Sequence, residues 1–351
     1  MSNTMGMVFA MSNSSDSNQV IAFSRNMDGT LTRMKEYKTG GSGTGTQKVD
    51  PLSSQGSLIV SRYGNMLFAV NAGSNSISSF NISSNGELTL VGAVPSGGTM
   101  PNCLAMYGNI LYVANSGNAD NQTTSNLTGF QINRDGSISR IPGATYLMSS
   151  PNARPSCIVF NPSGNKLVVS ELSTNKLSVF PVKSDGSLMQ ATTNDSNGAG
   201  PFGSVFLSNG ILLVTEAGAN ALSSYVNTDS GKLTVISGSV ANGQSATCWV
   251  SVNKNEQFAY TSNAGSNTIT IYDVNQNGSL DIRKNVPNNP NKTAAPIDSG
   301  VSKDGQNLYV LNGNEGTISI FSIRQNGEIN LIQVFEDTGL PQLGAQGLAV
   351  L

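Results

Sequence analysis

Residues 67–80 read LFAVNAGSNSISSF, and residues 258–272 repeat the phrase as FAYTSNAGSNTITIY. In each copy, apolar and small polar residues lie on both sides of a turn of Asn, Gly and Ser. This pattern predicts a strand, a polar turn and a second strand. A short apolar segment, such as SCIVF at residues 156–160, opens most copies. Because no stretch shows helical periodicity, the phrase indicates an all-β chain built from repeats.

A tight-turn signal marks the end of each repeat. Asn-Gly and Asp-Gly supply the positive φ angles of hairpin turns. Successive glycines of these turns are 57, 50, 50, 45, 47 and 49 residues apart. The seven dipeptides are Asp28-Gly29, Asn85-Gly86, Asp135-Gly136, Asp185-Gly186, Ser230-Gly231, Asn277-Gly278 and Asn326-Gly327.

Four short strands in a repeat of this length are typical of a β-propeller blade. The sequence therefore predicts an all-β, seven-bladed propeller with four antiparallel strands per blade, forming a single domain over residues 1–351. Residues 1–29 and the 24 residues after Gly327 together make one further repeat, split between the chain ends. We expect residues 345–351 to supply the opening strand of the first blade, which would close the ring and remove two exposed sheet edges.

Composition narrows the classes of partner. Only 11% of the residues are charged and the net charge is −2, which predicts neither nucleic-acid binding nor attachment to a membrane surface. No apolar run approaches the roughly 20 residues of a membrane span. Met1–Thr4 does not resemble a signal peptide, so the sequence as it stands suggests the cytoplasm. A removed signal peptide would instead make the protein periplasmic or secreted.

The residue types also limit the chemistry. The chain contains no histidine, the commonest general base and neutral metal ligand. Its three cysteines are an odd number, which argues against a disulfide framework. No metal site and no cofactor is predicted. A glycine-rich loop at residues 41–48 lacks the spacing of a phosphate-binding motif, and we expect it to cover one face as a lid.

The opening strands of a propeller line its central channel, so aligning them predicts which side chains meet there. The expected column at the channel mouth is Gly56, Asn102, Ser156, Gly203, Thr247, Asp298 and Gly347. The next column is Ser57, Cys103, Cys157, Ser204, Cys248, Ser299 and Leu348. Small side chains dominate the second column, as a crowded axis requires. The cysteines are therefore interpreted as buried structural residues.

The second strands should end at the same mouth. Their expected last residues are Asn71, Asn115, Glu171, Glu216, Asn263 and Asn312. Asn suits a polar turn, whereas no turn requires Glu. Together with Asp298, the two Glu residues would place three carboxylates around one funnel, where repulsion and burial can raise a pKa into a useful range. The alternative is that each carboxylate caps loop amides or pairs with a cation such as Lys176.

Several phrases resemble the lactonase family of seven-bladed propellers, which includes 6-phosphogluconolactonase-like proteins and fungal carboxymuconate cyclases. The phrases are residues 54–58 (SQGSL), 70–74 (VNAGS), 94–98 (VPSGG), 201–203 (PFG), 247–250 (TCWV) and 308–312 (LYVLN). The resemblance implies a cluster of His, Arg and Glu at the channel mouth that holds an acidic lactone or its open acid. In this chain Ser156 stands where the His is expected, and Phe202 and Ala264 stand where Arg is expected. Only Glu216 matches the cluster.

The loss of both arginines removes the clamp that an anionic substrate needs, so we expect a small polar ligand that is not strongly anionic. The leading hypothesis is a lactone hydrolase or cycloisomerase that uses Glu216 as its acid–base group, supported by Glu171 and Asp298. The residues expected to contact the ligand are Gln55, Asn102, Ser156, Phe202, Thr247, Trp249 and Asn263. The alternative is a non-catalytic propeller that presents a face to a protein or glycan partner.

Overall fold

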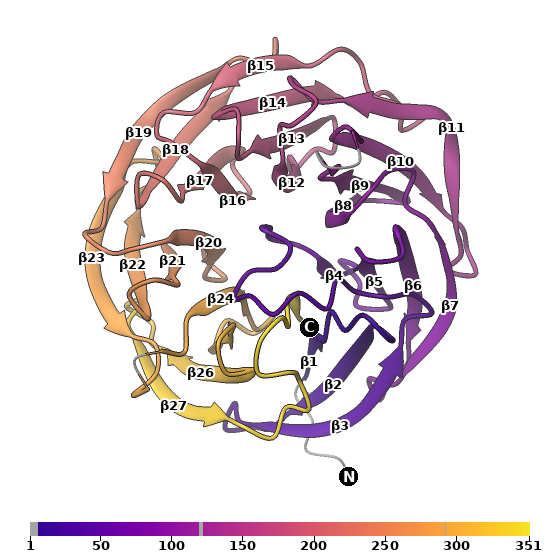
Figure 1. Ribbon diagram of the computed structural model, residues 1–351. Helices are drawn as coiled ribbons and strands as arrows, with labels where there is room; N and C mark the ends of the chain where they lie inside the picture. The colour runs from indigo at the N-terminus through magenta and orange to yellow at the C-terminus, as the bar shows by residue number, and fades with distance from the viewer. Residues whose placement is uncertain (1–5, 119–121, 292) are drawn as a thin grey trace.

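A computed structural model describes residues 6–118, 122–291 and 293–351. Within these ranges the strands form seven four-stranded antiparallel sheets, arranged as blades around a central axis (Figure 1). This confirms the predicted all-β, seven-bladed propeller. No helix in the described ranges has the length and apolarity to cross a membrane. Met1–Thr4, on which the expectation about a signal peptide rests, lies outside the described residues.

The strands of each blade run in order from the axis to the rim. The innermost strands are β28 (Leu348–Val350), β4 (Leu58–Val60), β8 (Pro101–Tyr107), β12 (Pro155–Phe160), β16 (Pro201–Phe206), β20 (Thr247–Val252) and β24 (Pro296–Val301). The second strands are β1 (Gly6–Met11), β5 (Met66–Asn71), β9 (Ile110–Asn115), β13 (Lys166–Glu171), β17 (Ile211–Glu216), β21 (Phe258–Asn263) and β25 (Asn307–Asn312).

The two outer positions of each blade follow the same order. The third strands are β2 (Gln19–Arg25), β6 (Ser76–Ile82), β10 (Asn126–Ile132), β14 (Lys176–Pro181), β18 (Ala221–Asn227), β22 (Thr268–Val274) and β26 (Thr317–Ile323). The rim strands are β3 (Leu31–Lys38), β7 (Leu88–Pro95), β11 (Ile138–Leu147), β15 (Thr192–Asp195), β19 (Leu233–Ala241), β23 (Leu280–Pro287) and β27 (Ile329–Phe335).

Burial follows position in the blade. Every residue of β5, β13, β17, β21 and β25 is buried, because neighbouring blades cover both faces of the second strands. The rim strands carry many more exposed side chains, as β3 and β23 show. The apolar core therefore lies between successive blades and not along the central axis.

The predicted hairpin glycines join the third strand of each blade to the rim strand. All seven adopt φ angles between 81° and 91°, a region that favours glycine. Tyrosines also connect neighbouring blades through these turns. The hydroxyl of Tyr112 donates to the carbonyl of Gly186, and Tyr260 and Tyr309 donate in the same way to Gly327 and Gly29. The repeated turn thus shapes its own blade and also binds it to the preceding one.

The ring closes as the sequence predicts. Strand β28 pairs with β1 in the sheet order β28-β1-β2-β3, with Leu348 opposite Ala10. At the junction between the last blade and the first, the guanidinium of Arg25 is 2% exposed. It lies 2.7 Å from a carboxylate oxygen of Asp304 and donates to Asn307. A short strand and a buried ion pair therefore join the two ends of the chain.

Candidate functional site

Three of the second strands end in an asparagine that performs the same structural task. Asn71, Asn263 and Asn312 each donate from Nδ2 to two hydroxyl groups on the third strand of their own blade. Their Oδ1 atoms accept from the segment that arrives from the preceding blade, as Asn263 does from Asn242 and Asn312 from Asn288. This position therefore clamps each inter-blade connection to the blade that follows it.

Glu216 occupies the same position and is fully buried. Its Oε1 accepts from the backbone N–H of Gly198 at 2.8 Å and from the Ser223 hydroxyl at 2.6 Å. Its Oε2 accepts from the Ser239 hydroxyl at 2.6 Å. The carboxylate clamps the connection to β16 as the asparagines clamp theirs. Its predicted role as an acid–base group stays a prediction.

Glu171 is also fully buried and clamps the connection to β12. It accepts from the backbone N–H of Ser149, and from the hydroxyls of Ser149, Thr174 and Ser178. Lys176 forms its ion pair with Asp195 instead. The sequence left open whether Glu171 caps loop amides or pairs with a cation such as Lys176. Its contacts match the first alternative.

The segment that follows β3 crosses the middle of the ring before the chain reaches β4 (Figure 1). The Ser54 hydroxyl donates to the carbonyl of Asn102, and the backbone N–H of Gln55 donates to the carbonyl of Ser156. The side-chain oxygen of Gln55 accepts from the N–H of Val250 at 2.9 Å. We call residues 49–56 the axial segment. It bonds to inner strands from opposite sides of the ring and fills the space where a ligand was expected.

Several of the residues predicted to contact a ligand lie at the inner ends of the blades, and most of their polar groups bond to the protein itself; the side-chain oxygen of Asn102 is an exception among the described residues. The Trp249 indole N–H donates to the carbonyl of Ser54 at 3.0 Å, and its ring packs edge-on against Phe202 with centroids 5.1 Å apart. Thr247 donates to Asn263 at 2.7 Å. The Ser156 hydroxyl donates to the carbonyl of Pro201 at 2.9 Å. Ser156, Phe202, Thr247 and Trp249 are all buried. A ligand could reach them only after the axial segment moves.

Strand pairing corrects the aligned columns. Each of these inner strands has a register shift near its start, so that Cys103 pairs with Ala114 and Trp249 pairs with Ser262. Cys103 is therefore equivalent to Trp249, and Cys248 lies one position earlier. Both strands carry the same one-residue shift, so the sequence alignment placed one copy a residue out of step with the other. All three cysteines are buried and free, as the structural interpretation predicts.

Two carboxyl groups near the axis have raised pKa values: Asp50 belongs to the axial segment, and Asp298 lies close enough for the charge of Asp50 to act on it. Burial raises the pKa of Asp298 to about 8, and the nearby charge of Asp50 adds to the effect. The backbone N–H of Gly347 opposes it by donating to Asp298 at 3.0 Å. Burial also raises the pKa of Asp50 to about 7, opposed by hydrogen bonds from the Gln346 side chain and the backbone of Ser53 and Ser54, and least by the charge of Arg154. Burial therefore favours the neutral form of both carboxyl groups.

A cavity of about 370 Å³ opens next to the axial segment. Pro51, Leu52 and Ser53 form one wall, and Arg154 contributes a guanidinium that donates to the Ser53 hydroxyl at 3.3 Å. Among the described residues, Oδ1 of Asp50 is buried without a hydrogen-bond partner. Asp50 directly precedes Pro51 in the chain but does not itself line the cavity.

The chain belongs to the lactonase family. The family model described as lactonase, 7-bladed β-propeller, matches residues 14–146 and 148–341. No curated protein sequence matches the chain.

Solved structures show the same fold. A candidate 6-phosphogluconolactonase of Bacteroides uniformis is 18% identical over 100% of both chains, with a TM-score of 0.79. The periplasmic gluconolactonase of Pseudomonas aeruginosa is 17% identical over 99% of this chain and 98% of its own, with a TM-score of 0.77. A streptogramin B lyase is 16% identical over 88% of this chain and 96% of its own, with a TM-score of 0.57.

In this lactonase-family chain, sequence reasoning overlooked Asp50 and Arg154. Both lie in connections between blades, where the repeat pattern carries no information. The only sequence signal for Asp50 was the Asp-Pro pair that it forms with Pro51, which is too weak to predict a site.

The expected lid at residues 41–48 is bound in place, because the backbone N–H groups of Gly45 and Thr44 both donate to Asn13. Among the described residues, no group of His, Cys, Asp and Glu side chains could hold a metal ion.

Proposed function

We propose that this lactonase-family protein hydrolyses a small neutral lactone in the cavity between the axial segment and Arg154. The observation that carries the proposal is the position of Asp50, a carboxyl group that directly precedes the cavity-wall residues Pro51, Leu52 and Ser53 and whose pKa is raised by burial to about 7. A base whose pKa lies close to the working pH is best suited to take a proton from an attacking water molecule.

Two further groups, Arg154 in the cavity wall and the buried Asp298 outside it, suit the remaining demands of ester hydrolysis. Attack on the lactone carbonyl creates a tetrahedral oxyanion, which a guanidinium such as that of Arg154 stabilises. Burial favours the neutral form of Asp298, so it adds little negative charge to repel the deprotonated form of Asp50. With Arg154 as the one charged side chain of the cavity wall, the predicted preference for a ligand that is not strongly anionic is retained. A phosphorylated sugar lactone would require further cations.

The test is acid release from a panel of neutral five- and six-membered lactones, followed at constant pH. We expect Asp50→Asn to lower kcat/KM by about 10²–10⁴, and Arg154→Gln to lower it by about 10²–10³. Glu216→Gln should change it less than threefold. If Glu216→Gln abolishes turnover while Asp50→Asn does not, Glu216 is the acid–base group and the present assignment is wrong.

A second candidate is the non-catalytic propeller that binds a protein or glycan. The axial segment favours it, because residues 49–56 occupy the axis and bury the predicted ligand contacts. Absence of turnover on every lactone, with the fold intact and a partner recovered by affinity capture, would support this candidate over the hydrolase.

A further inference from the structure

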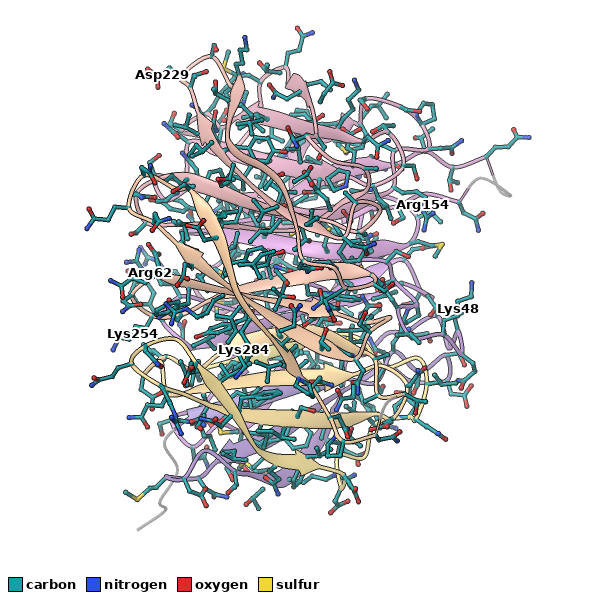
Figure 2. The ribbon with its side chains drawn as sticks, turned by 90° about the vertical axis from the view of Figure 1, so that its left-hand side faces the viewer. Lys48, Arg62, Arg154, Asp229, Lys254 and Lys284 are labelled. Carbon is teal, nitrogen blue, oxygen red and sulfur yellow. The ribbon has the colours of Figure 1, made fainter. Side chains whose placement is uncertain are left out.

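A second cavity lies on the other face of the ring from Arg154 (Figure 2). It has a volume of about 700 Å³ and lies between the second and third blades. Its walls are the turns after β4 and β8 and the end of β10, with Arg62, Tyr63, Tyr107 and Arg134 among its residues. Figure 2 shows Arg62 on the side of the molecule opposite Arg154 and Lys48. The cavity is therefore separate from the proposed lactone site.

The charge of this cavity is entirely positive. Arg62 and Arg134 belong to its lining, and that lining contains no carboxylate. Across the described residues, neither guanidinium forms an ion pair or a hydrogen bond. The nearest acid in sequence, Asp135, is engaged by the backbone N–H and the hydroxyl of Ser137. Two unpaired guanidiniums that face one hollow have the donor groups that bind a carboxylate or phosphate in bidentate fashion.

The rest of the lining is apolar and aromatic. Val60, Met66, Met106 and Ile132 contribute aliphatic and thioether surface. Tyr63 is 86% exposed and Tyr107 is 40% exposed. Tyr107 is supported from behind by Phe160, with ring centroids 6.0 Å apart. Aromatic rings and methionine side chains of this kind pack well against a flat apolar body. A volume of this size is within the range of small-molecule sites, about 300–1,000 Å³.

We propose that this cavity binds a small organic anion, one with an apolar, preferably aromatic, body and a carboxylate or phosphate head group. The two guanidiniums would hold the head group, and the tyrosines and methionines would pack against the body. The site stands independently of the lactone chemistry proposed above, since it shares no residue with that cavity.

Calorimetric titration with 2-naphthoate, 2-naphthyl phosphate and the neutral 2-naphthamide tests the proposal on the intact chain. We expect at least one of the two anions to bind at least about tenfold more tightly than the amide. Comparison of the two anions identifies the preferred head group.

Charge variants of the same protein locate the binding. Arg62→Gln and Arg134→Gln should each weaken the anion by about tenfold or more, and the double variant should abolish binding. Lys254→Gln is the matched control, because Lys254 lies on the same side as Arg62 but outside the cavity (Figure 2). Unchanged melting temperatures would show that the variants fold. Equal binding of anion and amide, equal loss in the control, or no binding at millimolar concentration would each overturn the proposal.

Discussion

The carboxyl group of Asp298 is enclosed by the innermost strands, and burial favours its neutral form. Its folded pKa of about 8 lies far above the ordinary value of 3.8 for an aspartate, so between these values the folded state binds more protons than the unfolded state. The resulting stabilisation is fully present below about pH 4 and is lost as the pH rises towards 8. Asp50 acts in the same direction up to about pH 7.

We therefore expect the free energy of unfolding to fall between pH 5 and pH 9, with Asp298 contributing on the order of 2–4 kcal/mol. Urea titrations at several pH values measure the slope. Asp298→Asn keeps the shape of the side chain without its charge, so this variant should show a clearly flatter profile. An identical slope in the wild type and the variant would contradict the burial-driven shift.

The buried carboxylate of Glu216 makes a second prediction at the residue scale. Glu216→Ala removes the acceptor of one backbone N–H and two hydroxyls, and should destabilise the fold by about 2–4 kcal/mol. Glu216→Gln introduces an amide like those of Asn263 and Asn312. The variant should lose no more than about 1.5 kcal/mol of its free energy of unfolding. Thermal unfolding of both variants measures whether the side chain of Glu216 stabilises the fold through these hydrogen bonds. Similar losses in both would refute the amide equivalence.

At the scale of the element, the repeated strands and turns could be read directly from the sequence, because hairpin glycines and alternating residues act over a few positions. The axial segment could not be predicted. Its course depends on backbone carbonyls, such as those of Asn102 and Ser156, that become available only once the blades are assembled. The predicted funnel residues stay a prediction, and the segment that covers several of them carries no periodic signal.

Gln55 makes the contribution of the axial segment measurable. Its side chain accepts from Val250 and donates to the carbonyl of Ser204, so it connects two inner strands. Gln55→Ala should lower stability by about 1–3 kcal/mol because the N–H of Val250 loses its partner. Hydrogen exchange should show faster exchange of that amide. Unaltered exchange at Val250 would mean that the segment does not hold the inner strands.

At the scale of the whole molecule, closure of the ring depends on three residues of β28 paired with β1. Removing residues 348–351 exposes the edge of β1 and uncovers the apolar surface of the first and last blades. We expect cooperative unfolding at a melting temperature lower by at least several degrees, measured by scanning calorimetry. A truncated chain with the melting temperature of the full chain would show that the ring does not need this strand.

The function of the whole molecule is harder to infer from the sequence than its fold. The family could be inferred because its fold leaves repeated phrases along the chain, whereas Asp50 and Arg154 come together through two separate inter-blade connections. The most direct test is kcat/KM of wild type and Asp50→Asn on the neutral lactone that the wild type hydrolyses fastest. The account predicts a pH profile that rises to a plateau above about pH 7, and a loss of at least about a hundredfold in the variant. Equal rates for the two proteins would contradict it.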